Sequence, residues 1–244
     1  MSPKTPKTRE QKTGATGRQG SKAHPVGKGA SKRRGGRLGG ATKLVLGLAV
    51  AVVALGAIFY FSNRPGSSSG PATAGKYPYQ VGSPGPGEVA PPIRLASTAG
   101  GTFDLASQRG RSVLLYFQEG LTSQPCWDQL KDIEANWARF QALGIGSMVS
   151  ITTDPLKDLR QRVADEGLST PVLSDSELAV SRAYRANCYG MMGDSRDGHS
   201  FIVVGPDGRI AWRADYGGAP RYIMDVPAGA LLADLAKGLG KTQP

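Results

Sequence analysis

Along residues 88–244, short apolar segments typical of strands alternate with segments in which apolar residues recur at the spacing of a helix. Apolar runs of strand length lie at 113–117 and 145–151. After the first run, Leu130, Ile133, Trp137 and Phe140 recur at helical spacing, which predicts a helix over about 125–142. The same patterns predict strands at 93–96, 102–105, 170–173, 201–204 and 210–213, and helices at 155–166, 176–185 and 227–239. Strands that alternate with helices and end in a hairpin and a helix predict an α/β domain with a central mixed sheet flanked by helices.

Turn and cap residues mark the element boundaries. Gly100-Gly101 and Pro206-Asp207-Gly208 each separate two short apolar runs and predict hairpins. Pro125 suits the first turn of a helix, where a missing N–H costs nothing. Asp154 directly precedes Pro155 and is expected to cap the next helix.

The net charge of +11 comes from the N-terminal tail. Residues 1–43 contain twelve Lys or Arg and one acid, and residues 44–244 balance at 18 of each. The tail lacks aromatic residues and is rich in Gly, Lys, Ser, Thr and Pro, so we expect it to be disordered. A charge confined to a tail does not indicate nucleic-acid binding by the folded part, and it suits anionic lipid head groups.

Residues 44–61, LVLGLAVAVVALGAIFYF, form an uncharged apolar run. As a helix this run would be about 27 Å long, close to the roughly 30 Å apolar thickness of a bilayer. Because the basic residues precede it, the positive-inside rule places the tail in the cytoplasm and the later residues outside. We therefore expect residues 44–61 to be one transmembrane signal anchor, followed by a Gly/Ser/Pro linker over 62–87 and an extracytoplasmic domain over 88–244. The alternative for the apolar run is a cleaved signal peptide.

The chain has two cysteines, Cys126 and Cys188. Cys126 lies at the predicted start of a helix that follows a strand, where the helix dipole stabilises a thiolate. We therefore expect the pKa of Cys126 to lie below the usual value of about 8.5. A thiolate is the nucleophile of sulfur redox chemistry, and a small buried hydrophobic residue is the alternative role.

Three motifs occur in order along the domain. Residues 87–95 are GEVAPPIRL, residues 110–117 are GRSVLLYF, and residues 201–210 are FIVVGPDGRI. They resemble the opening G-x-x-A-P-x-F-x-L, the first core strand and the later D-G hairpin of the alkyl hydroperoxide reductase/thiol-specific antioxidant (peroxiredoxin-like) family. The resemblance implies a thioredoxin-like fold and a thiol-dependent oxidoreductase that needs no metal or organic cofactor. It also implies that Cys126 is the peroxidatic cysteine and that Ser123 supplies the hydroxyl of the family's P-x-x-x-[TS]-x-x-C motif.

The sequence departs from both active-site patterns of this fold. Glu119 stands where the peroxiredoxin motif has proline, and its charge would oppose a thiolate near it. The family's arginine position is occupied by Gly198, with Arg196 the nearest substitute. Ser123 takes the place of the first cysteine in the C-x-x-C motif of thioredoxin-like oxidoreductases. Peroxide reduction and exchange with protein thiols or disulfides both stay open.

Cys188 is the candidate resolving thiol. In the fold that the resemblance implies, the loop 187–200 packs near the helix that carries Cys126. Cys188 could then attack a sulfenic acid on Cys126 and form a disulfide. An inert thiol or a permanent structural disulfide are the alternatives.

Two other functions compete with the redox hypothesis of a membrane-tethered extracytoplasmic oxidoreductase. Cys188, Met191, Met192 and His199 share one loop, and soft sulfur ligands with an imidazole suit Cu(I). One alternative is therefore a copper-binding and delivery protein that holds the metal through Cys126, Cys188 and His199. The other is a catalytically degenerate domain that binds a partner protein.

Overall fold

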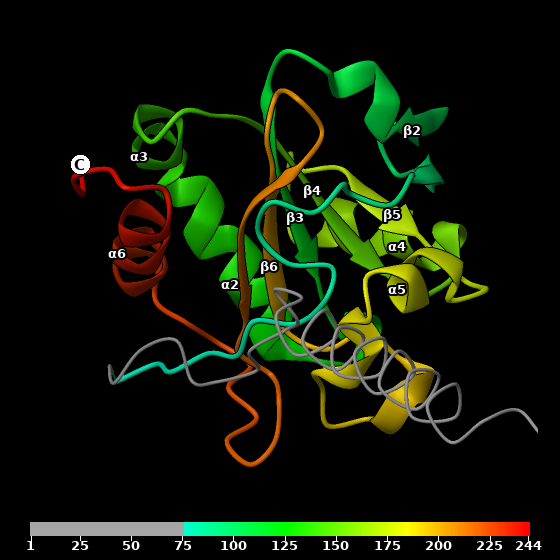
Figure 1. The fold of residues 1–244 in the computed structure, drawn as a ribbon. Coiled ribbons are helices and arrows are strands. Elements are labelled where there is room, and N and C mark those ends of the chain that lie inside the picture. Colours follow the sequence, from blue (N-terminus) through cyan, green and yellow to red (C-terminus); the bar gives the residue numbers. More distant parts are fainter. Residues whose placement is uncertain (1–75) are drawn as a thin grey trace, which may run out of the picture. The chain divides into compact units, whose positions relative to one another are not determined.

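A seven-stranded mixed sheet forms the centre of the computed structural model, which describes residues 76–244 (Figure 1). The strand order is β2-β1-β5-β4-β3-β6-β7. Strand β3 (Ser112–Phe117) lies in the middle, parallel to β4 (Ile145–Thr152) and antiparallel to β6 (Ser200–Val204). The predicted α/β architecture with a central mixed sheet is confirmed. The other strands are β1 (Arg94–Ser97), β2 (Thr102–Asp104), β5 (Val172–Ser174) and β7 (Ile210–Asp215).

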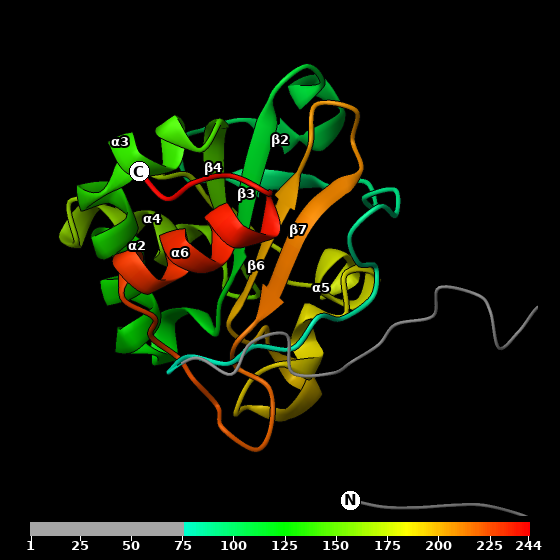
Figure 2. The ribbon, with the colours of Figure 1, turned by 60° about the vertical axis from the view of Figure 1, so that its left-hand side comes forward.

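Helices cover both faces of the sheet (Figure 2). Side chains along β3 alternate, so Leu114 and Tyr116 enter one core cluster while Leu115 and Phe117 enter the other. The first cluster lies under α2 (Gln124–Ala135), α4 (Leu156–Asp165) and α6 (Ala228–Gly238). The second lies under α5 (Ala179–Ala183) and the short 3₁₀ helix η1 (Leu105–Gln108). Tyr116 therefore points towards α2, the helix that carries Cys126.

The helix expected over 125–142 is two helices. Helix α2 ends at Ala135, and α3 (Trp137–Ala142) begins after Asn136. The Asn136 side-chain amide donates to the backbone oxygen of Asp132 at 2.9 Å and also bonds its carboxylate. Asn side chains compete with the helical backbone for such partners, which explains the interruption.

Two further helix boundaries differ from expectation because of buried aspartates. The helix expected over 176–185 is shortened to α5, since Leu178 is in the left-handed region at φ 59° and Asp175 accepts from the N–H of Ser181. Asp154 does not cap α4; its carboxylate bonds the Leu121 N–H and the Arg196 guanidinium instead.

The first described residues lie along the outer edge of β7. Gln80 pairs with Asp215 at one end of that strand, and Val89 pairs with Arg209 at the other. Gln80 and Gly87 of the expected linker thus form backbone hydrogen bonds with the domain. The expected tail 1–43, anchor 44–61 and first part of the linker, 62–75, lie outside the described residues. Within 76–244, no helix has both the length and the apolar character to cross a bilayer.

Candidate active site

The candidate site lies at the end of the sheet where β3 ends and β6 begins. Phe117 pairs with Ser200 at this end, and Tyr116 pairs with Phe201. The chain leaves β3, turns through the 3₁₀ helix η2 (Gly120–Thr122) and enters α2, so the start of α2 lies above the end of the strand. Loops that join strands to helices commonly carry functional residues, because the strands fix their position.

Cys126 lies in the first turn of α2 and is fully buried. The Ser123 hydroxyl, one helical turn earlier, donates a hydrogen bond to the Cys126 sulfur at 3.2 Å. The Nδ1 atom of His199 lies 3.9 Å from the same sulfur. The sequence-predicted pair Ser123 and Cys126 is therefore in contact, and the His199 imidazole also lies close to the thiol.

Tyr116 and His199 form a buried polar pair beside this thiol. Tyr116 Oη lies 3.0 Å from His199 Nδ1, and the two rings pack edge to face. Burial lowers the pKa of His199 to about 3, so the imidazole is neutral at physiological pH. Burial also raises the pKa of Tyr116 well above its ordinary value, so the phenol keeps its proton and stays a donor. The Nε2 atom of His199 is buried without a hydrogen-bond partner.

The expectation of a lowered thiol pKa at Cys126 is wrong. Burial raises the pKa of Cys126, and the charge of Glu119 adds to the rise. Hydrogen bonds from Ser123, the Glu119 backbone and Tyr116 stabilise the thiolate and act in the opposite direction. A helix N-terminus lowers a thiol pKa when water also reaches the sulfur, and here the loss of hydration outweighs the dipole.

Glu119 connects the site to the loop that follows Cys188. Its carboxylate is buried and accepts a hydrogen bond from the Met191 N–H at 2.6 Å. Arg196 Nη1 donates to the Glu119 carbonyl at 3.0 Å and pairs with Asp154 at 2.8 Å. The expected packing of the 187–200 loop against the Cys126 region is thus present at Met191, Arg196 and His199.

The position of the family's arginine cannot hold a side chain in this protein. A Cβ atom at Gly198 would overlap the carbonyl of Tyr189. Arg196, the expected substitute, uses its guanidinium on Asp154 and on the Glu119 backbone. The thiol is instead surrounded by Ser123, Tyr116 and His199.

Cys188 lies on the surface at the end of the 3₁₀ helix η3 (Ala186–Cys188). Both cysteines are free thiols, and Cys126 is buried while Cys188 is exposed. No disulfide joins Cys126 and Cys188 in the structure. A disulfide between Cys126 and Cys188 would require an oxidant and would also require their Cα atoms to lie within roughly 7 Å of each other.

Of the residues of the copper hypothesis, Cys126 and His199 lie together in the core, whereas Cys188, Met191 and Met192 are exposed. His199 is in the core, where Nδ1 contacts Tyr116 and Cys126, whereas Met191 and Met192 are 56% and 48% exposed. Among residues 76–244, no three His, Cys, Asp or Glu side chains are grouped in a way that suits a metal ion.

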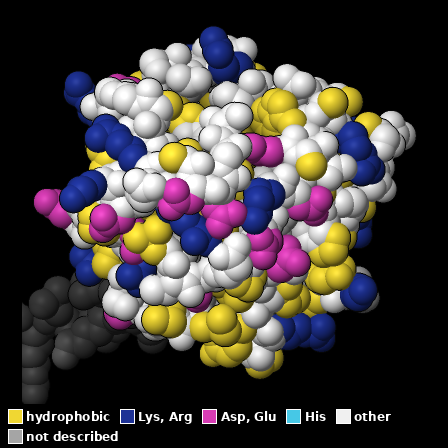
Figure 3. Space-filling view, turned by 180° about the vertical axis from the view of Figure 1, so that it is seen from behind, with side chains coloured by type: hydrophobic (Ala, Val, Ile, Leu, Met, Phe, Trp, Pro, Cys, Tyr) yellow, Lys and Arg dark blue, Asp and Glu magenta, His cyan; other side chains and the backbone are white. Residues whose placement is uncertain are grey.

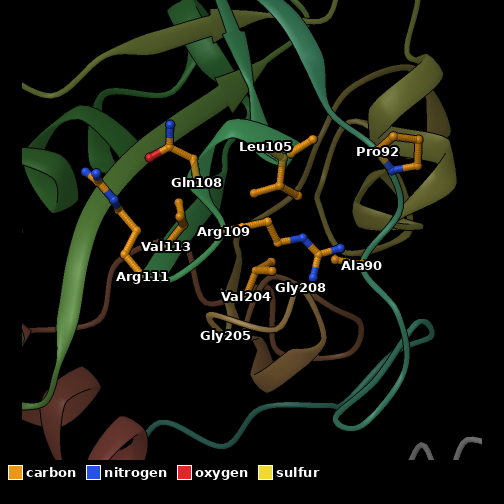
Figure 4. Close-up of a pocket in the computed structure, with 11 residues that line it drawn as sticks. Ala90, Pro92, Leu105, Gln108, Arg109, Arg111, Val113, Val204, Gly205 and Gly208 are labelled. Atoms are coloured by element: carbon orange, nitrogen blue, oxygen red, sulfur yellow. The ribbon is translucent and has the colours of Figure 1, made fainter.

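A cavity of about 130 Å³ lies at the opposite end of the sheet (Figure 4). Leu105, Val113 and Val204 form its apolar wall, and the Arg109 side chain extends across it towards Gly208. Because Val113 and Val204 pair at the start of β3 and the end of β6, this cavity is remote from Cys126.

Comparison with known proteins identifies the family. The model of the AhpC/TSA family matches residues 86–213, more than half of the chain. The chain belongs to the AhpC/TSA family. "Putative peroxiredoxin Rv2521" of Mycobacterium tuberculosis is 34% identical over 130 residues, which cover 51% of this chain and 81% of that protein. The crystal structure of Peroxidoxin BcpB from Mycobacterium tuberculosis matches with a TM-score of 0.50 and 18% identity, over 64% of this chain and 94% of that one.

These findings confirm the peroxiredoxin-like family and the thioredoxin-like fold expected from the motifs. This AhpC/TSA protein is a thiol-dependent oxidoreductase of the peroxiredoxin/thioredoxin type. Of the residues around its thiol, sequence reasoning found Ser123 but missed Tyr116, and it considered His199 only as a metal ligand. A signal was present, because Tyr116 carries the one hydroxyl in the apolar run 113–117 and His199 directly precedes the strand that pairs with this run.

Proposed function

We propose that this protein is a peroxidase in which Cys126 reduces the peroxide bond. The observation that carries the proposal is the hydrogen bond of 3.2 Å from the Ser123 hydroxyl to the Cys126 sulfur, in the first turn of a helix. The nearby Tyr116 hydroxyl and the Glu119 backbone also act to lower the pKa of Cys126. Donors arranged around a sulfur stabilise the thiolate and the negative charge that develops on a departing oxygen.

In the proposed step, the Cys126 sulfur attacks one peroxide oxygen. An S–O bond forms, the O–O bond breaks, and the sulfur loses two electrons to the peroxide. The leaving alkoxide takes up the thiol proton and departs as an alcohol, or as water when the substrate is hydrogen peroxide. Neutral His199, whose Nδ1 lies 3.9 Å from the sulfur, is too weak a base at a pKa of about 3 to accept the thiol proton, so the proton passes to the leaving oxygen.

Cys188 is proposed as the resolving thiol. It would attack the sulfenic sulfur of Cys126, form an S–S bond and release water, after which an external dithiol would restore both thiols. Because Cys126 is buried and Cys188 is exposed, this step requires a movement of the 187–196 loop. Three polar contacts restrain that loop: Met191 to Glu119, and Arg196 to Glu119 and Asp154.

We further propose that residues 44–61 anchor the protein in the cell membrane, with the basic tail in the cytoplasm near anionic lipids and the redox domain outside. The support is the sequence alone: eighteen uncharged apolar residues preceded by a basic segment. Membrane fractionation with protease protection of the C-terminal domain tests this part separately.

The test of peroxide reduction uses the reduced full-length chain and one equivalent of hydrogen peroxide. We expect peroxide to convert both thiols to a reversible intramolecular disulfide, as counted by alkylation and mass spectrometry. In Cys188→Ser, Cys126 should remain a trappable sulfenic acid, whereas Cys126→Ser should consume no peroxide. A chain that leaves peroxide untouched but reduces a model disulfide would replace peroxide reduction with thiol–disulfide exchange.

A further inference from the structure

Exposed apolar side chains are found around the candidate active site. Of the four large hydrophobic side chains that are exposed among residues 76–244, Met191, Met192 and Tyr222 lie in the two loops next to the site. We call these three residues the apolar rim. The fourth, Val89, lies at the opposite end of β7.

Hydrogen bonds connect the rim loops to the site residues. The Met191 N–H binds the Glu119 carboxylate, and the loop of Tyr222 is joined to His199 through the Gly217 N–H at 3.1 Å. Both loops lie at the lower end of the domain in Figure 1, and hydrophobic side chains gather along the lower edge in Figure 3. An exposed apolar patch of this kind marks a contact with a partner or a membrane.

The described chain also begins at this end of the domain. Gln80 pairs with Asp215 at the end of β7, and its side chain donates to the Ala219 carbonyl at 2.7 Å, in the same loop as Tyr222. Fourteen residues, 62–75, separate this part of the chain from the apolar segment 44–61. A Gly/Ser-rich chain of this length spans roughly 20 Å on average, about half the roughly 40 Å diameter of a domain of this size. A membrane anchor would therefore keep this end of the domain nearer to the lipid than the end with Val89.

We propose that the apolar rim docks on the lipid surface and gives Cys126 access to hydroperoxides of membrane lipids. The inference rests on the proposed function, since it requires both the anchor and the peroxidase chemistry. The reaction is the step described above, in which Cys126 gains the oxygen and the lipid hydroperoxide leaves as a lipid alcohol. Half-exposed methionine and tyrosine side chains suit the interface, because both types place apolar atoms among acyl chains at little cost.

The test compares two peroxides on the full-length chain reconstituted in phosphatidylcholine vesicles. One set of vesicles contains phosphatidylcholine hydroperoxide, and the other receives hydrogen peroxide in the buffer. The rim variant is Met192→Ser with Tyr222→Asn, since Asn tolerates the left-handed φ of 48° at that position. Met191 is left unchanged, so that no new side chain alters the turn whose backbone N–H binds the Glu119 carboxylate. The control is Val89→Ser, which removes an exposed apolar side chain at the far end.

We expect the rim variant to be oxidised at Cys126 about tenfold more slowly than the unmodified chain by the lipid hydroperoxide, and at the same rate by hydrogen peroxide. The Val89→Ser chain should match the unmodified chain with both peroxides. Equal rates of the rim variant and the unmodified chain with the lipid hydroperoxide would overturn the docking inference and leave peroxide reduction standing. Failure of both peroxides to oxidise Cys126 in any chain would refute the proposed function and, with it, this inference.

Discussion

Replacing Ser123 by alanine should make the Cys126 thiol markedly less reactive. The Ser123 hydroxyl is the largest of the contributions that lower the pKa of Cys126 against the effect of burial. A hydrogen bond to an ionised group contributes about 1.5–3 kcal/mol, and a sulfur acceptor belongs near the lower limit. About 1.4 kcal/mol corresponds to a factor of ten in the equilibrium between thiol and thiolate. The variant should therefore carry about tenfold less thiolate at neutral pH.

The assay is the rate of alkylation of Cys126 by iodoacetamide as a function of pH, followed by mass spectrometry of the Cys126 peptide. The profile of Ser123→Ala should move to higher pH, with a rate at pH 7 about tenfold below that of the unmodified chain. Thr122→Ala is the matched control, because Thr122 is exposed and precedes Ser123 directly. Ser123→Thr keeps the hydroxyl and should restore the rate.

A Ser123→Ala chain whose alkylation profile coincides with that of the Thr122→Ala control would refute this reasoning. It would mean that the contact of 3.2 Å does not stabilise the thiolate, and that access to the buried sulfur limits the rate instead.

Three other predictions concern the surroundings of the thiol. The pKa of His199 falls from 6.5 to about 3 on burial, so between these values the unfolded chain binds one more proton than the folded chain. The free energy of unfolding should therefore decrease as the pH is lowered from 6.5, by up to about 5 kcal/mol near pH 3. Urea unfolding of His199→Gln should lack that part of the pH dependence, and an unchanged pH dependence would contradict a buried neutral imidazole. Gly120→Ala should lower the free energy of unfolding by about 3 kcal/mol or more, because Gly120 has φ +81° and a Cβ would overlap the buried Asp154 carboxylate. Thermal unfolding measures this loss, and an unchanged melting temperature would show that the turn can relax. Glu119→Gln removes a charge that raises the pKa of Cys126 and keeps an oxygen for the loop, so alkylation at neutral pH should become about twofold faster, and slower alkylation would show that the charge stabilises the site.

Local sequence patterns determined most of the fold. The apolar run at 113–117 became the central strand, and Gly100-Gly101 and Pro206-Asp207-Gly208 became the turns of two hairpins. These features depend on residues that are close in the sequence, so the spacing of apolar residues and the types of turn residue were sufficient to predict them. The spacing of Ser123 and Cys126 also fixed their contact, because residues three apart in a first helical turn lie side by side.

Local side-chain contacts and tertiary structure together decided where helices begin and end. Asn136 interrupts a continuous helical pattern through its bond to Asp132, and Leu178 adopts a left-handed conformation before α5. Asp154 was expected as a helix cap from its place before Pro155, yet its carboxylate binds Leu121 and Arg196, which come from distant parts of the chain. The Asn136 contact is local, whereas the partners of Asp154 come from distant segments, and only the assembled fold determines which of those partners its carboxylate reaches.

The environment of the thiol was likewise a tertiary property. A helix N-terminus predicted a lowered pKa for Cys126, but complete burial under the packed helices raises it, because desolvation depends on atoms from the whole domain. The pairing of Tyr116 with His199 follows from the antiparallel register of β3 and β6, two strands separated by more than eighty residues. The sequence by itself determined the cysteine, its hydroxyl neighbour and the family. Only the packed sheet decided which donors surround the sulfur and in which direction its pKa moves.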